Sequence, residues 1–179
     1  MLFDLDGTLT DTFELWYRAV AGLVERHAGI HLRRDEYRAR WWGMDGRGKI
    51  REILRPRDDQ VECLYRELVS LLMAKVSLVR PLPGAREAIE ALARYVPLAV
   101  ISNGPAAFLN AQLAHVGLDH LFSAKVADAE PKPSPAGIFR ACEALGVHPG
   151  EVVFVGDSQF DTQAATNAGV KCIVIPEEQ

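Results

Sequence analysis

The chain has 179 residues, of which 49% are hydrophobic, and 20 Lys and Arg against 24 Asp and Glu give a formal net charge of −4. This length is enough for one domain, or for one domain with an insert, and the charge argues against a nucleic-acid partner. No apolar run approaches the ~18 residues of a membrane helix, and no charged leader precedes an apolar stretch. We therefore expect a cytoplasmic protein without a membrane partner.

Short apolar runs alternate with helical patterns through most of the chain. The apolar runs cover residues 1–3, 96–101, 151–155 and 169–175, with a weaker run at 124–127. Continuous β-branched runs are typical of parallel strands that are covered on both faces. Helical patterns occupy residues 84–95, 106–116, 135–145 and 158–168. This alternation predicts an α/β fold with a doubly wound, mostly parallel sheet.

One long stretch, residues 12–79, departs from the alternation because it contains helical patterns and no convincing strand. The expected helices cover residues 13–27, 35–42, 47–54 and 61–79. A connection of this length is too long for a plain loop in a compact domain, so we expect a helical insert with its own core. The expected core domain then comprises residues 1–11 and 80–179. Five aromatic residues are expected to form the core of the insert: Trp16, Tyr17, Trp41, Trp42 and Tyr65.

The first apolar run ends in two aspartates. Because side chains alternate along a strand, Asp4 and Asp6 should leave its end on the same side, while Leu5 points into the core. In a doubly wound sheet, ligands bind beyond the carboxyl ends of the strands. An ordinary Asp-Gly turn explains this short segment equally well when it is taken alone.

Other strand ends deliver further polar residues to the same rim. Ser102 and Asn103 are good donors to phosphate oxygens, and Lys132 is a point charge whose position is restricted by flanking prolines. Asp157 and Asp161 are four positions apart, so a helix that begins near residue 158 would turn both carboxylates toward one ion. Oxygen ligands without a His or Cys cluster favour Mg²⁺ over zinc. Together, these residues predict a site for a divalent cation and a phosphoryl group.

At this point the sequence resembles the haloacid dehalogenase superfamily of aspartate-nucleophile hydrolases. Residues 4–11, Asp-Leu-Asp-Gly-Thr-Leu-Thr-Asp, match the first motif of that family closely. Ser102, Lys132 in Lys-Pro-Ser-Pro, and the segment from Gly156 to Asp161 match its second, third and fourth motifs in order. The insert looks like the α-helical cap of the family, and the overall pattern is most similar to its phosphoglycolate phosphatase-like branch.

The resemblance implies a Mg²⁺-dependent phosphatase that acts on a small phosphorylated metabolite. Asp4 would attack phosphorus and form an aspartyl-phosphate, and Asp6 would protonate the leaving oxygen and then deprotonate the attacking water. The metal would be held by Asp4, the backbone carbonyl of Asp6, and Asp157. An acid at position 6 favours phosphate esters over the substrates of dehalogenases and phosphonatases.

The resemblance also assigns the remaining polar residues. Ser102 and Lys132 would bind phosphoryl oxygens, and Lys132 would also balance the acids. The residues themselves, rather than the resemblance, suggest Asn103 as a further phosphate donor. Asp161 would lie behind the metal ligands and act through a metal-bound water or Lys132. Two alternative functions remain: a sugar-phosphate mutase of the β-phosphoglucomutase type, and a catalytically silent phosphate-binding protein. The oligomeric state is left open between monomer and homodimer.

The segment at residues 43–49 is expected to face the site from the cap. Arg47 and Lys49 would grip a second anionic group of the substrate, such as a carboxylate. A flexible turn with solvated charges is an equally good interpretation. Only Met1–Phe3 precede Asp4, so we also expect a short central strand with weaker support for Asp4. The early end at Gln179 indicates either a trimmed fold or an incomplete chain.

Overall fold

A parallel sheet forms the centre of the molecule in the computed structural model, which describes residues 1–175. Its five strands lie in the order β5-β4-β1-β6-β7, and every neighbouring pair is parallel. The strands are β1 (Leu2–Asp4), β4 (Ala99–Ile101), β5 (Ala124–Val126), β6 (Val153–Gly156) and β7 (Lys171–Val174). Each predicted run therefore overlaps a strand, and the central strand is as short as predicted.

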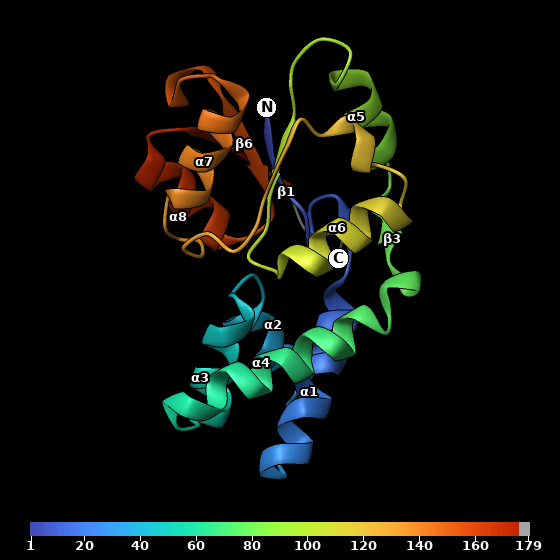
Figure 1. Cartoon of the computed structure of the whole chain (residues 1–179), viewed down its shortest axis with the longest axis vertical. Coiled ribbons are helices and arrows are strands. Elements are labelled where there is room, and N and C mark those ends of the chain that lie inside the picture. Colours follow the sequence, from blue (N-terminus) through green and yellow to red (C-terminus); the bar gives the residue numbers. More distant parts are fainter. Residues whose placement is uncertain (176–179) are drawn as a thin grey trace.

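Helices cover both faces of the sheet (Figure 1). They are α5 (Ala85–Leu92), α6 (Ala106–His115), α7 (Ala136–Leu145) and α8 (Gln159–Ala168), together with 3₁₀ turns at Asp119–Leu121 and Pro149–Glu151. Leu2 packs in the apolar cluster that includes residues of α7 and α8, whereas Phe3 packs in the cluster that includes residues of α5 and α6. The two faces of β1 are thus both buried, which explains why Leu2 and Phe3 are both apolar before the strand ends at Asp4.

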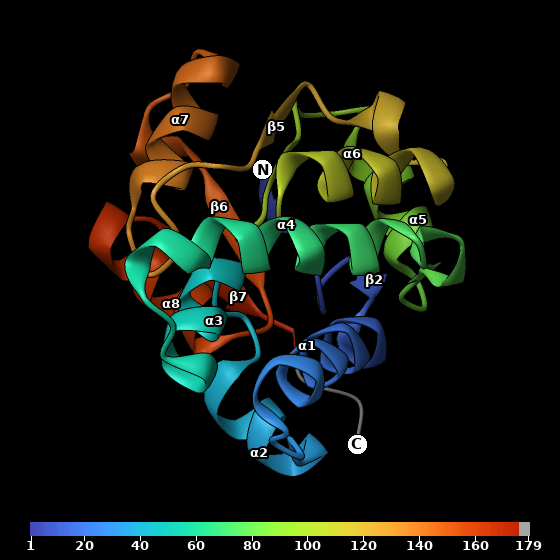
Figure 2. The ribbon, with the colours of Figure 1, turned by 60° about the horizontal axis from the view of Figure 1, so that its bottom comes forward.

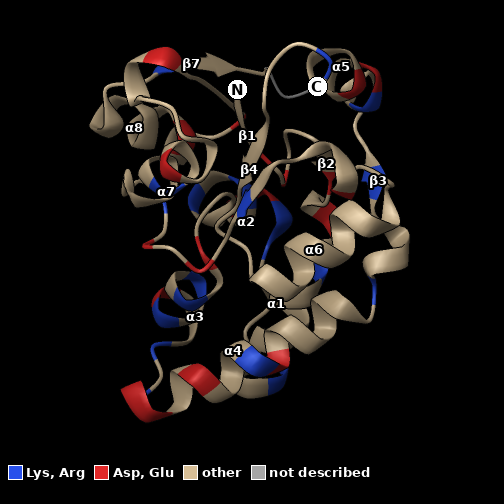
Figure 3. Ribbon diagram, turned by 45° about the horizontal axis from the view of Figure 1, so that its top comes forward, with Lys and Arg blue, Asp and Glu red and all other residues tan. Residues whose placement is uncertain are grey.

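Residues 12–79, called the helical region below, contain four α-helices and no sheet strand. They are α1 (Phe13–Ala28), α2 (Arg34–Trp41), α3 (Gly46–Leu54) and α4 (Asp58–Met73), followed by a 3₁₀ turn at Val76–Leu78. The prediction of a single helix over residues 61–79 is therefore wrong at its C-terminal end, since α4 ends at Met73. Figure 2 shows α4 running across α1 and α3. Acidic and basic residues are interspersed on α3 and α4 (Figure 3).

A second, very short sheet escaped prediction. Strand β2 (Thr10–Asp11) pairs antiparallel with β3 (Arg80–Pro81). Two residues are too few to show an alternating pattern, so the sequence carries no signal for either strand. The pair joins the segment that leads from the sheet into the helical region to the segment that leads back to the sheet.

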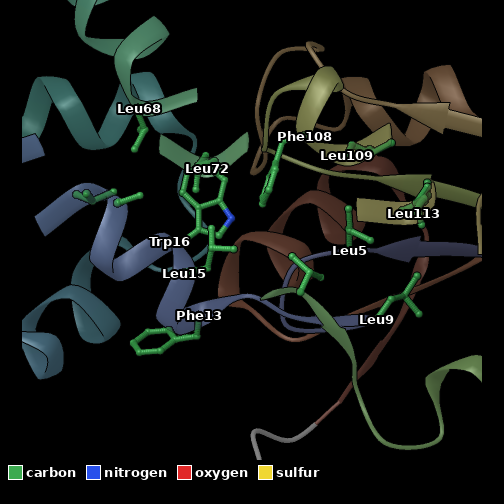
Figure 4. Packing of buried hydrophobic residues seen from close by; sticks show 14 of the residues in the cluster. Leu5, Leu9, Phe13, Leu15, Trp16, Leu68, Leu72, Phe108, Leu109 and Leu113 are labelled. Carbon is green, nitrogen blue, oxygen red and sulfur yellow. The ribbon is translucent and has the colours of Figure 1, made fainter. Parts of the chain in front are cut away.

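Buried side chains run without a break from the helical region to the sheet (Figure 4). Trp16 of α1 meets Phe108 of α6 edge to face, with ring centroids 6.0 Å apart. Trp16, Trp41 and Tyr65 are buried, which confirms their interpretation as core residues. Tyr17 and Trp42 are only partly buried. Within residues 1–175, no helix is both long enough and apolar enough to cross a membrane.

Candidate active site

Three of the four predicted acids and the predicted lysine meet in one small cavity at the carboxyl end of the sheet. It is lined from the sheet side by Asp4, Asp6, Asn103, Gly104, Lys132, Asp157 and Ser158. The helical region closes it with Trp16, Trp42, Gly43, Met44 and Lys49. Its volume of about 20 Å³ has room for about one water molecule. The helical region is therefore seated directly over the carboxylates.

Lys132 lies at the centre of a buried ion-pair triad. Its ammonium group contacts Asp4 and also donates to Asp161 Oδ1 at 2.6 Å. The side chains of all three are at most 6% exposed. Burial by itself acts to lower the pKa of Lys132, yet the carboxylates of Asp161 and Asp4 raise it overall, so the lysine stays cationic.

The carboxylates form a group with the donor chemistry of a magnesium site. Asp4, Asp157 and Asp161 each offer one oxygen, and these oxygens lie within 4.8 Å of one another. Both oxygens of Asp161 are already engaged, Oδ1 by Lys132 and Oδ2 by Ser158 at 2.5 Å. Asp161 therefore holds Lys132, while Asp4 and Asp157 stay the predicted ligands of the cation.

Burial also disfavours the charged form of both remaining acids. It raises the pKa of Asp4 well above the usual range, against the opposing effect of Lys132. It raises the pKa of Asp157 to about 6, although a hydrogen bond from Trp42 lowers it. A divalent cation bound by these two groups would stabilise their ionised forms, so the buried carboxylates of this cavity fit such an ion.

Asp6 is held by four side-chain donors, three of which the sequence analysis missed. Its Oδ1 accepts from Thr12 at 2.7 Å, Gln112 at 3.1 Å and Trp16 at 3.2 Å. Its Oδ2 accepts from Ser102 at 3.1 Å. Gln112 did have a signal, because it is a polar residue three and four positions after apolar Leu109 and Phe108 on a buried helix.

The residues that follow β4 are engaged with their neighbours. Ser102 is buried, donates to Asp6, and accepts from the backbone N–H of Gly104 at 2.9 Å. Asn103 accepts from the Lys132 N–H at 2.8 Å and donates to the Gly43 carbonyl at 2.9 Å. Asn103 therefore joins the lysine loop to the helical region, while its predicted phosphate contact stays a prediction.

The two basic residues expected at the site separate in the structure. Lys49 is only 2% exposed, lines the cavity, and contacts the Met44 carbonyl. Its ammonium nitrogen lies 4.5 Å from the centroid of the Trp16 ring. Burial lowers the pKa of Lys49 to about 8, despite the opposing charge of Asp6.

Arg47 lies outside this cavity. Its guanidinium donates to Glu62 at 3.0 and 3.1 Å and stacks on Tyr65 in a neighbouring cavity of about 330 Å³. Arg47 and Lys49 both lie on α3, which begins at Gly46. Residues two positions apart on a helix point in different directions, so only one of the pair enters the site.

Comparisons with known proteins agree with this arrangement. The sequence model of the haloacid dehalogenase-like hydrolase family matches residues 1–175. Phosphoglycolate phosphatase of Yersinia pestis is 31% identical, over 96% of this chain and 78% of that protein. Phosphoglycolate phosphatase of Pseudomonas putida is 30% identical, over 97% of this chain and 67% of that protein.

A solved structure extends the likeness to the fold. CbbY from Rhodobacter sphaeroides, crystallised in complex with phosphate, aligns with a TM-score of 0.85 and 29% identity, covering 98% of this chain and 84% of that chain. The motif order, the buried Asp4–Lys132–Asp161 triad and these relatives agree with one another. The chain belongs to the haloacid dehalogenase-like hydrolases and is a phosphoglycolate phosphatase-like phosphatase within them.

Proposed function

We propose that the protein is a Mg²⁺-dependent phosphatase that hydrolyses a small phosphorylated metabolite through an aspartyl-phosphate at Asp4. One observation carries this proposal: Asp4, at the end of β1, contacts the Lys132 ammonium and has an oxygen within 4.8 Å of an oxygen of Asp157. A nucleophilic carboxylate needs positive charge around it, because the phosphoryl group that it attacks is itself anionic.

Two displacements account for the reaction. In the first, an Asp4 oxygen bonds to phosphorus and the ester P–O bond breaks, while Asp6 gives a proton to the leaving oxygen. In the second, Asp6 takes a proton from water, the water oxygen bonds to phosphorus, and Asp4 leaves as a carboxylate. Lys132 holds phosphoryl oxygens throughout. A cation at Asp4 and Asp157 would neutralise charge on the phosphoryl oxygens.

The helical region acts in this proposal as a cap formed by residues 12–79. A cavity of about 20 Å³ is far smaller than the 300–1,000 Å³ typical of ligand sites. Access for a phosphate ester therefore requires the cap to shift away from the sheet. We place the hinge of this motion at the β2–β3 pair, where the chain passes between the sheet and the cap in both directions. The pair contains only four residues, so little structure resists the motion there.

The substrate that we propose carries a second anionic group close to the phosphate. Lys49 is the basic residue that the cap brings into the cavity. A buried ammonium favours an anion as its partner, because an unpaired charge is costly in this surrounding. The names of the relatives, phosphoglycolate phosphatases, agree with a small ester that also carries a carboxylate.

Removal of the metal tests the proposed function directly. We expect phosphate release from a panel of small esters to fall by roughly 100-fold with a chelator, because the cation supplies several kcal/mol of charge stabilisation. Added Mg²⁺ should restore the rate. The panel should include phosphoglycolate, a sugar phosphate and a nucleoside monophosphate. Equal rates with chelator and with Mg²⁺ would contradict the proposal, and transfer that requires a bisphosphate and releases little phosphate would indicate a mutase.

Lys49→Met is expected to weaken substrate binding and to stabilise the fold. Loss of a charged contact should raise KM about tenfold. Removal of a buried ammonium whose pKa is about 8 should raise the free energy of unfolding near neutral pH by about 1–3 kcal/mol. The gain should shrink as the pH rises from 8 toward the ordinary value of 10.5, because wild-type Lys49 becomes neutral over this range.

Steady-state kinetics and urea unfolding measure the two effects. Arg47→Met is the matched comparison, since its guanidinium lies in the neighbouring cavity and its loss should leave KM within about threefold of wild type. An unchanged KM in Lys49→Met would show that Lys49 does not take part in substrate binding. In wild type, KM should rise above pH 8 as Lys49 loses its proton.

A further inference from the structure

One indole of the helical region contacts the acidic cluster directly. Trp42, the residue after α2, donates from Nε1 to Asp157 Oδ2 at 3.0 Å. The other oxygen of Asp157 accepts only a longer bond of 3.3 Å, from Thr8. The shortest hydrogen bond that the structure gives this carboxylate therefore comes from the helical region, 115 residues away in sequence.

Gly7 makes this contact sterically possible. It has a φ of +93°, and a Cβ at this position would lie 2.3 Å from Asp157 Oδ2 and 3.0 Å from Trp42 Cζ2. The carboxylate and the indole thus both pack against the bare backbone of the turn after β1. Three segments that are remote in sequence meet at this point, which makes the indole part of the acidic cluster.

The next residue anchors the same turn. The Gly43 carbonyl accepts from Asn103 at 2.9 Å. Gly43 has a φ of +80°, and a Cβ at this position would lie 2.9 Å from Phe160 and 3.1 Å from Ser158. The turn at residues 42–43 is therefore seated on the segment that carries Asp157, with no room for an added side chain at Gly43.

We propose that Trp42 is a positioning residue that holds Asp157 ready for the divalent cation and so couples metal affinity to the seating of the helical region. The inference rests on the cation site proposed above. A carboxylate whose orientation is already fixed loses less conformational freedom when it binds a metal. Mutation of the residues that hydrogen-bond to metal ligands commonly weakens metal affinity 10–100-fold. Because binding couplings are reciprocal, the metal should in turn favour the seated position.

Calorimetric titration of the full chain with Mg²⁺, without substrate, tests the proposal. Trp42→Phe keeps a ring and removes the donor, and we expect it to weaken Mg²⁺ binding about tenfold. Trp41→Phe is the matched control, since the Trp41 indole donates to Glu52 at 3.0 Å within the helical region and should leave affinity within about twofold of wild type. Unchanged or tighter binding by Trp42→Phe would overturn the inference. Absence of Mg²⁺ binding in wild type would instead contradict the cation site itself.

A second variant separates positioning from general damage. Gly43→Ala leaves the indole and Asp157 intact but pushes the turn away from Phe160, so it should also weaken Mg²⁺ binding. We expect the double variant Trp42→Phe with Gly43→Ala to bind Mg²⁺ as weakly as Trp42→Phe alone. Displacing the turn breaks the hydrogen bond to Asp157, and this bond is already absent when the indole donor has been removed. Fully additive losses would contradict the coupling. If circular dichroism shows that Trp42→Phe is unfolded, wild-type affinity in Gly43→Ala would overturn the proposal.

Discussion

Asp4→Asn is expected to reduce phosphate release by roughly four orders of magnitude. An amide has the shape of the carboxylate but cannot form the proposed aspartyl-phosphate, which would divide the displacement into two steps. The fold should tolerate this change, because burial already disfavours the charge of Asp4 and raises its pKa. Phosphate release measures the loss, and mass spectrometry of the acid-quenched wild-type enzyme should place the phosphoryl group on the peptide that contains Asp4.

The matched control for this change is Asp11→Asn. Asp11 belongs to the same motif but is exposed on β2, so its loss should leave the rate within about twofold of wild type. Substantial turnover by Asp4→Asn in a folded protein would exclude Asp4 as the nucleophile. A wild-type enzyme that turns over without any phosphorylated peptide would argue for direct attack by water.

Lys132→Met is expected to lower the free energy of unfolding by about 3–5 kcal/mol at neutral pH and to abolish turnover. The lysine is the cation of a buried triad, and its loss leaves two carboxylates that are 6% and 1% exposed without their cationic partner. Urea unfolding monitored by circular dichroism measures the stability loss. The rate falls because phosphoryl oxygens lose their ammonium donor.

The stability loss should also depend on pH, with a sign that follows from the carboxylates. Lys132 opposes the effect of burial on Asp4, so without this lysine the Asp4 carboxylate binds its proton still more tightly in the folded state than in the unfolded state. Stability should therefore fall as the pH rises above the ordinary carboxyl pKa of about 4. Lys132→Met should be closer to wild type at about pH 5 than at about pH 7.5.

A surface pair supplies the control for this experiment. Lys125 contacts Asp119 at 2.5 Å, but the side chains are 29% and 45% exposed. Lys125→Met should cost less than about 1 kcal/mol and show little change between the two pH values. Equal losses for the two lysine variants would contradict the view that the triad is held together by buried charge.

Much of the site was predictable because its residues lie at strand ends. Parallel strands end at the same edge of a sheet, so polar residues after the apolar runs had to converge once the alternation of strands and helices was recognised. This reasoning placed Asp4, Asp6, Lys132 and Asp157 together, and the structure brings all four to one cavity. Strand-end reasoning turned Asp161 toward the ion together with Asp157, whereas the family resemblance placed it behind the metal ligands, acting through a metal-bound water or Lys132; in the structure it pairs with Lys132.

The contacts made by the helical region were not predictable in the same way. Trp42 was expected only as a core aromatic, yet its indole reaches Asp157. Thr12 and Trp16 hold Asp6, although neither belongs to a polar pattern at a strand end. Their positions depend on how the helices dock over the sheet, and docking is decided by packing of side chains that are distant in sequence.

The sequence by itself determined the alternation of strands and helices, the run of helices at residues 12–79 and the convergence of Asp4, Asp6, Lys132 and Asp157, because periodicity and strand ends are local features. Only the tertiary structure decided that Lys49 enters the cavity while Arg47 pairs with Glu62 outside it. The physical reason is the rotation of α3 about its axis, which follows from its packing against α4 and separates residues two positions apart.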